Sequence, residues 1–127
     1  MGRYMDEYRS KLRTADEVAK LIKDDDEVSM GHFAMAPIKF DEALAKRADE
    51  LHGVVMRACC PIFLPQTAIA GYPDRQPFIW MSGFFSPYDR HLASMGLCRY
   101  STQNYGFTPH IARRGYSKKS NYFVLIL

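Results

Sequence analysis

The chain has 127 residues, of which 47% are hydrophobic and 24% are charged, and its formal net charge is +3 at pH 7. This length and balance fit a single globular domain over residues 1–127, and they exclude a disordered chain or two domains of ordinary size. The charge excess is small and no basic run concentrates it, so we expect no binding to nucleic acid.

The cysteines and the N-terminal residues indicate a cytoplasmic protein. Residues 1–13 are charged throughout and lack the apolar centre of a secretory signal. No apolar run reaches the roughly 18 residues of a membrane span, so we expect no membrane contact. Cys59, Cys60 and Cys98 are odd in number, two of them are adjacent, and no CxxC spacing occurs. We therefore expect reduced, inert thiols, with neither a disulfide framework nor structural zinc.

The first half of the chain predicts a βαβ unit. Residues 14–17, Thr-Ala-Asp-Glu, have the pattern of a capping box that begins a helix ending near Lys23. Residues 27–30 predict a short strand, and 54–58 predict a second one. Between them, an apolar stripe predicts a helix from about residue 40 to 52. We therefore expect an α/β fold, an open and mostly parallel sheet with flanking helices.

The second half gives weaker signals. Residues 59–77 are rich in Pro, Gly and small residues and predict a long loop, which is either functional or conceals a short element. Residues 78–85 predict one strand, or two strands broken at Ser82. Ser86-Pro87 then predicts a capped helix that ends at Gly96. A strand over 99–105 and a helical turn over 109–114 follow.

Residues 122–127, within a strand predicted over 121–127, form a nearly continuous apolar run. This pattern is typical of a strand that is buried on both faces of a parallel sheet. Something must then cover the strand. The cover is the remainder of a longer protein, a partner chain, or the rest of this same domain.

The loop from Gly31 to Pro37 is the strongest candidate for a binding site. It follows a predicted parallel strand and leads into a helix, and ligands of open α/β sheets gather at such places. Gly31 would let the backbone approach a ligand, and His32 is the titratable group of the loop. The structural alternative is that Gly31 only makes a turn and that Phe33 and Met35 belong to the core. Neither GxGxxG nor GK[ST] is present, so the loop is no dinucleotide or P-loop motif.

Other candidates are weaker. Residues 86–90 form a second strand-to-helix junction, where helix amides and Arg90 could attract an anion. The structural alternative there is a surface arginine. The remaining histidines, His52, His91 and His110, show no HxxxH or HExxH spacing, so no metal site is expected.

Several segments together resemble the start of the acetyl-CoA hydrolase/transferase family, which includes 4-hydroxybutyrate and butyrate CoA-transferases. The resemblance is good over residues 8–56 and weaker beyond. It is carried by Tyr8–Val18, Leu21-Ile22-Lys23, Val28–His32, Pro37, Glu42-Ala43-Leu44, Arg47–Leu51 and Val54-Val55, and then by the spacing of Phe84–Arg90 and Pro109.

The resemblance implies an enzyme that passes coenzyme A from an acyl-CoA to a small carboxylic acid, without a metal. A glutamate of a second domain would become a covalent glutamyl-CoA intermediate. No residue of this chain matches that glutamate, so the chain alone is expected to be inactive and to work with a C-terminal domain or partner subunit, within an oligomer. The resemblance implies a CoA cleft lined by Gly31, His32, Phe33, Ala34 and Pro37, with Arg90 as an anion contact.

Two segments depart from the family pattern. The family's Phe-Arg-His-Asn run reads Phe78-Ile79-Trp80-Met81 here, and its Gly-Gly-Asn-Thr-Arg turn reads Ser86-Pro87-Tyr88-Asp89-Arg90. Polar sets have thus become apolar or bulky. These changes support a second hypothesis, a diverged and non-catalytic module that uses the same fold to bind or regulate a partner. A free-standing ligand-binding domain is a third.

Overall fold

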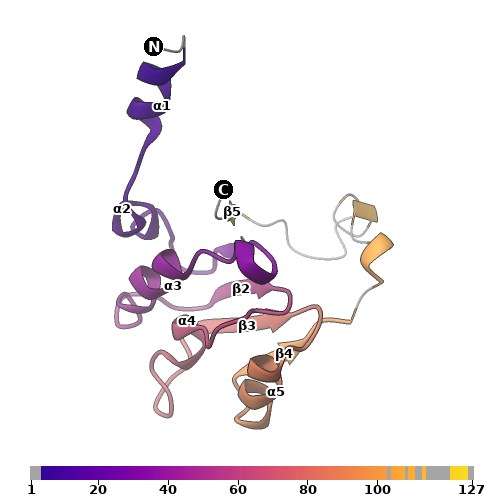
Figure 1. Ribbon diagram of the computed structural model, residues 1–127. Coiled ribbons are helices and arrows are strands. Elements are labelled where there is room, and N and C mark those ends of the chain that lie inside the picture. Colours follow the sequence, from indigo (N-terminus) through magenta and orange to yellow (C-terminus); the bar gives the residue numbers. More distant parts are fainter. Residues whose placement is uncertain (1–3, 103, 108, 111–112, 114–120, 126–127) are drawn as a thin grey trace.

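A parallel sheet organises the computed structural model, which describes residues 4–102, 104–107, 109–110, 113 and 121–125. Among these residues the strand order is β4-β3-β2-β1-β5, and every neighbouring pair is parallel. The α/β class and the open parallel sheet are therefore confirmed (Figure 1). The strands are β1 (Glu27–Met30), β2 (Val54–Ala58), β3 (Phe78–Ser82), β4 (Cys98–Tyr100) and β5 (Tyr122–Val124).

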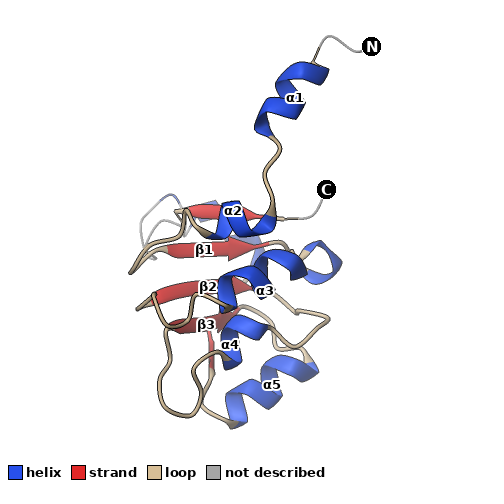
Figure 2. Cartoon of the chain, turned by 90° about the vertical axis from the view of Figure 1, so that its left-hand side faces the viewer, coloured by secondary structure: helices blue, strands red, loops and turns tan. Residues whose placement is uncertain are grey.

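Helices cover one face of this sheet, as Figure 2 shows. They are α2 (Ala15–Ala19), α3 (Ile38–Ala45), α4 (Gln66–Ile69) and α5 (Pro87–Ser94). A further helix, α1 (Met5–Lys11), projects away from the body in both views and buries none of its residues. Two 3₁₀ turns complete the described elements, η1 (Phe33–Met35) and η2 (Tyr105–Phe107). None of the described helices is long and apolar enough to cross a membrane.

The core lies between the sheet and these helices. Alternate strand residues point to opposite faces, and the burial of β2 and β3 alternates accordingly. Val28, Met56 and Trp80 are paired in register and fully buried against α3 and α5, where Leu44 and Leu92 meet them. The intervening row, Ser29, Arg57, Met81 and Arg99, is also in register and faces the side opposite α2–α5.

The predicted capping box at Thr14 is confirmed. Its hydroxyl accepts from the Glu17 amide at 3.2 Å, and the Thr14 amide donates to the Glu17 carboxylate at 2.7 Å. The helix is shorter than predicted, because α2 ends at Ala19 and the chain then turns. The next helix is shifted too, since α3 runs from Ile38 to Ala45 and turns rather than helix follow to residue 50.

The predicted loop over 59–77 does conceal an element, the short helix α4. Its start is held by Asp41 of α3, a fully buried carboxylate that accepts from the Gln66 amide at 2.6 Å and from the Thr67 hydroxyl. Burial raises the pKa of Asp41, and these hydrogen bonds oppose the shift. The cap comes from a residue 25 positions upstream, so no local pattern could reveal it.

The predicted Ser86-Pro87 helix start is confirmed as a capping box with Asp89, and α5 ends before Gly96 as expected. Asp89 is fully buried. Its carboxylate accepts from the Ser86 amide at 2.8 Å and from the Trp80 indole at 3.3 Å. Trp80 and Asp89 therefore join β3 to α5, and both departures from the family pattern have a structural role in this chain.

The expectation for residues 121–127 is wrong in one respect: the strand is not buried on both faces. β5 lies at the edge of the described sheet beside β1, and Phe123 is 63% exposed on the face opposite α2–α5. Tyr122 and Val124 pack against the core instead. An apolar run alone does not distinguish an edge strand over an open face from a central one. Residues 126–127 lie outside the described residues.

Two weaker predictions are partly confirmed. The strand expected over 99–105 is shorter, Cys98–Tyr100, and a 3₁₀ turn follows at Tyr105–Phe107. Pro109, His110 and Arg113 have helical backbone, and residues 111, 112 and 114 of the predicted helical turn lie outside the described residues.

The buried Asp89 gives a test of this arrangement. We expect Asp89→Asn to lower the free energy of unfolding by about 1–3 kcal/mol, because an amide cannot accept the Trp80 and Ser86 hydrogen bonds as a carboxylate does. Urea unfolding followed by circular dichroism measures the change. Asp74→Asn, at an exposed loop position, is the matched control, and an equal loss in both variants would contradict the assignment.

Candidate functional site

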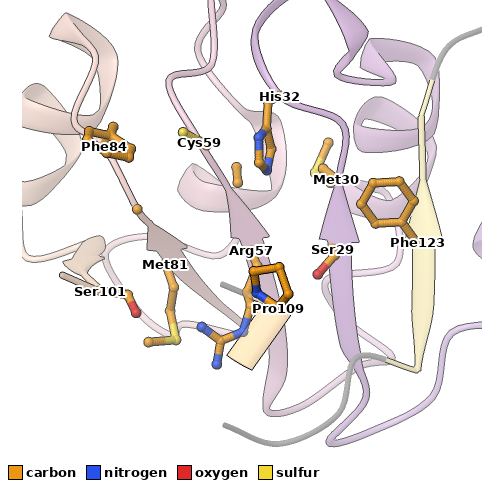
Figure 3. A pocket seen from close by; sticks show the side chains of 12 residues that line it. Ser29, Met30, His32, Arg57, Cys59, Met81, Phe84, Ser101, Pro109 and Phe123 are labelled. Carbon is orange, nitrogen blue, oxygen red and sulfur yellow. The ribbon is translucent and has the colours of Figure 1, made fainter. Parts of the chain in front are cut away.

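A cavity of about 360 Å³ opens at the carboxyl ends of the central strands (Figure 3). It extends onto the sheet face opposite α2–α5, where Ser29, Arg57 and Phe123 project from β1, β2 and β5. This is the edge at which ligands of parallel sheets bind. Its lining residues are Ser29, Met30, His32, Arg57, Ala58, Cys59, Met81, Gly83, Phe84, Ser101, Pro109 and Phe123.

The Gly31–Pro37 loop borders this cavity, and His32 is its contribution to the lining. Gly31 is buried and its amide donates to the Val124 carbonyl at 2.8 Å, which extends the pairing of β1 with β5. A Cβ at Gly31 would overlap the Met35 carbonyl oxygen and lie 2.8 Å from the Met35 carbonyl carbon. Glycine is therefore required at this position because the backbone of Met35, in the same loop, lies close to it.

Backbone hydrogen bonds connect the loops at this edge. The Phe33 amide donates to the Cys59 carbonyl at 3.3 Å, and the Cys60 amide donates to the Phe84 carbonyl at 3.1 Å. Phe33 and Cys60 have φ angles of 53° and 48°, in the left-handed region that residues with a Cβ rarely adopt. Such strain occurs preferentially at functional sites, where the surrounding structure maintains it.

His32 is half-buried at the mouth of the cavity, in the loop after β1. Burial lowers the pKa of its imidazole below the usual 6.5, because removal from water disfavours the charged form. The ring is therefore mainly neutral at pH 7, able to donate from one nitrogen and accept at the other.

Arg57 is the residue of this site that sequence reasoning missed. It lies near the end of β2, and its side chain extends onto the sheet face opposite α2–α5. Its Nε donates to Oε1 of Glu27 at 2.6 Å. The Glu27 side chain is 2% exposed and that of Arg57 27%. One signal was available, because an arginine in the otherwise apolar segment Val-Val-Met-Arg-Ala is unusual in a parallel strand.

The thiols at this edge are protected. Cys59 is buried in the wall of the cavity, and burial raises its pKa to about 11. Burial also raises the pKa of Cys98 to about 12. The Cys60 thiol donates to the Phe84 carbonyl at 3.2 Å. No disulfide joins these cysteines, and the raised pKa values of Cys59 and Cys98 leave few thiolates at those two positions at neutral pH.

The other predicted site residues lie apart from the cavity lining. Phe33 is 55% exposed, and it stands with exposed Ala34 at the tip of the loop. Pro37 is buried beside a second, apolar groove near Phe40 and Val124. Arg90 is exposed on α5, and its guanidinium donates to the Phe85 carbonyl at 3.0 Å. No group of three metal-ligating side chains occurs in the part of the chain that the structure describes.

A family model described as "Acetyl-CoA hydrolase/transferase N-terminal domain" matches residues 2–126. Two curated relatives are similar in sequence. The probable butyrate:acetyl-CoA coenzyme A-transferase of Syntrophomonas wolfei is 41% identical over 93 residues, covering 73% of this chain and 21% of the relative. The butyryl-CoA:acetate CoA-transferase of Anaerostipes caccae is 32% identical over 107 residues, covering 84% of this chain and 24% of the relative. The chain thus spans less than a quarter of either relative.

Solved structures share the fold. RipA from Yersinia pestis superposes with a TM-score of 0.72 at 22% identity, over 87% of this chain and 28% of that one. The 4-hydroxybutyrate CoA-transferase from Porphyromonas gingivalis gives a TM-score of 0.55 at 18% identity, over 96% and 26%. At these identities the likeness concerns the arrangement of the elements.

Gly31 gives the first test of the site. We expect Gly31→Ala to destabilise the chain by about 1–3 kcal/mol, because the added methyl group meets backbone atoms of Met35 that cannot rotate away. Gly83→Ala is the matched control, since a Cβ there has no neighbour within 4 Å. Chemical unfolding of both variants gives the comparison, and a Gly31 variant as stable as the Gly83 variant would refute this packing.

His32 gives the second test of the site. The unfolded chain binds a proton at His32 near pH 6.5, whereas the folded chain does so only at lower pH. Between these values the unfolded state holds more protons, so stability is lost as pH falls through this window. We expect His32→Gln to reduce the loss between pH 7.5 and 5.5, measured by urea unfolding. The control His91→Gln, at an exposed position of α5, should keep it, and identical pH profiles for the two variants would contradict the prediction.

Proposed function

This chain belongs to the acetyl-CoA hydrolase/transferase family, and on that premise we propose that it forms the N-terminal part of an enzyme that moves CoA between an acyl-CoA and a carboxylic acid. The observation that carries the proposal is the cavity at the carboxyl ends of β1–β3, in a chain 41% identical over 93 residues to a probable butyrate:acetyl-CoA coenzyme A-transferase. A cytoplasmic location and an oligomeric assembly are part of the proposal.

The cavity suits one end of an acyl-CoA. Its volume of about 360 Å³ is near the lower limit of pockets that hold drug-sized ligands. Coenzyme A is a larger molecule, so the nucleotide must extend beyond the cavity. We propose that the exposed loop tip at Phe33 and Ala34 borders its path, with His32 at the entrance and Gly31 and Pro37 as the support of the loop. Arg90 stays a prediction, without support from its position on α5.

The nucleophile of the transfer is proposed to lie outside this chain. A covalent glutamyl-CoA requires a glutamate whose carboxylate reaches the thioester, and no glutamate lines the cavity. Glu27 is buried and paired with Arg57, and Glu17 is part of the capping box. The chain's other glutamates, Glu7, Glu42 and Glu50, form ion pairs on helices or turns.

The absence of a glutamate from the cavity lining also favours a second candidate function. A chain of this family without a partner that supplies the nucleophile would be a non-catalytic module that binds CoA or regulates an active transferase. The two candidates differ in one respect, which is whether the chain can support turnover once the remaining part of a transferase is present.

A chimera tests this difference. Residues 1–127 of this protein replace the matching N-terminal segment of the Syntrophomonas wolfei relative, and CoA exchange between butyryl-CoA and acetate is measured. We expect turnover by the chimera, within about tenfold of the parent when the new interface is imperfect, and none by the 127-residue chain alone. The relative without its N-terminal segment is the control for background activity.

Each outcome decides between the candidates. A chimera that is folded and inactive beside an active parent would favour the non-catalytic module. Turnover by the isolated chain, free of other proteins, would contradict the proposal that the glutamate lies elsewhere.

A further inference from the structure

We propose that Arg57 binds the carboxylate group of the acid substrate, with Glu27 as the positioning residue that orients its guanidinium. The inference rests on the proposed function and deepens it, because it identifies the residue that recognises the acid and the kind of acid that fits. The binding site is the part of the cavity on the open sheet face, where Arg57, Ser29 and Phe123 meet (Figure 3).

The charge of this cavity is concentrated in one side chain. Arg57 is the one permanently charged residue among those that line it, and the His32 imidazole is mainly neutral at pH 7. A guanidinium stays protonated at every physiological pH. Glu27 balances the charge of Arg57 but does not line the cavity, so among the described residues the guanidinium is the charged group that a ligand would meet, and its N–H donors suit an anion.

The ion pair between Glu27 and Arg57 is unusual for a parallel sheet. Strands of such sheets are usually apolar, and well-packed apolar residues are often as stabilising as a buried pair. Glu27 is 2% exposed, so its carboxylate is kept from water, and it is paired with Arg57 at 2.6 Å. The pair stands on the face opposite α2–α5, whereas the helix-facing positions of β1 and β2 are apolar.

Glu27 fixes one side of the guanidinium and leaves another available. Arg57 Nε and Nη2 lie 2.6 Å and 3.5 Å from the two Glu27 oxygens. The third nitrogen, Nη1, has no hydrogen bond with any described residue. Asn121 holds the backbone at the base of the pair, because its side chain accepts from the Glu27 amide at 2.8 Å. The guanidinium plane is thus oriented before a ligand arrives, which lowers the entropy that binding would cost.

The surroundings of Arg57 select the ligand. Its register partner is Ser29 on β1, and Ser29 is paired in turn with Phe123 on β5. Neighbours of this kind share one sheet face and lie in contact distance. An acid with one carboxylate and a short apolar tail fits such a site, because the carboxylate meets Arg57 and the tail meets one of the apolar side chains on either side of it, Met81 on β3 or Phe123 on β5.

The test is the binding of butyrate to the 127-residue chain, followed by ligand-observed NMR, with butyramide as the uncharged isostere. We expect butyrate to bind and butyramide to bind at least tenfold more weakly, since the loss of charge-assisted hydrogen bonds costs about that factor. The double variant Glu27→Gln/Arg57→Gln removes the charge and leaves no buried carboxylate unpaired. It should lose the preference for butyrate, and Arg57→Lys should retain part of it.

The matched control is Arg99→Gln. Arg99 is exposed on β4, in register with Met81 and outside the cavity lining. Its substitution therefore removes a positive charge from the same sheet face without changing the cavity. Circular dichroism checks that each variant is folded. Arg99→Gln should bind butyrate as the wild type does.

Two outcomes would overturn the inference: a folded wild-type chain that binds butyrate no better than butyramide, or a folded double variant that binds butyrate as the wild type does. Equilibrium binding needs no turnover, so the result is independent of the exchange assay. In the active chimera, the double variant should raise KM for acetate about tenfold or more and leave KM for butyryl-CoA nearly unchanged. If the ion pair were purely structural, its loss would change kcat or stability and would not raise KM for acetate selectively.

Discussion

The parallel pairing of β1, β2 and β3 is the constraint on which the rest of the structure depends. It brings three strand ends and the loops after them to one edge, where the cavity lies. Because register determines which residues stand side by side, Ser29, Arg57 and Met81 form one row although they are far apart in the chain. A slip of one residue would turn that row toward the helices and bury the arginine among apolar side chains.

Buried carboxylates hold the elements around this sheet in place. Asp41 connects α3 to the start of α4, and Asp89 connects β3 to α5 through Trp80. Both carboxylates accept hydrogen bonds from backbone amides, which compensates for their removal from water. The loops that border the cavity therefore begin and end at rigid positions, and the strained backbone at Phe33 and Cys60 is maintained by hydrogen bonds to neighbouring loops.

The proposed role of the cavity is recognition rather than nucleophilic attack. Its cysteine is held as a thiol by burial, and no glutamate lines it, while Arg57 and the neutral His32 supply hydrogen-bond donors. The proposal agrees with the lengths of the curated relatives. Each is more than four times as long as the segment that it shares with this chain. Binding and turnover can accordingly be tested separately in this protein.

The sequence by itself determined the local features. Thr14 and Ser86 were identified as helix caps, the βαβ unit was recognised from its periodicity, and the family was recognised from short runs over residues 8–56. These signals depend on neighbours within about four positions, because capping and helical periodicity act over one turn of helix. The loop at Gly31 and His32 was placed at the correct edge for the same reason, since a strand end followed by glycine is a local pattern.

Only the tertiary structure decided which side chains share the cavity. Arg57 was passed over because its partner Glu27 stands 30 residues away, and Arg90 was named as a possible anion contact because sequence shows a helix start but not the direction of its side chain. The edge position of β5 and the exposure of Phe123 were likewise invisible in the apolar run of residues 121–127. Strand order and the face on which each residue lies arise from contacts between distant segments, and no local preference of the chain encodes them.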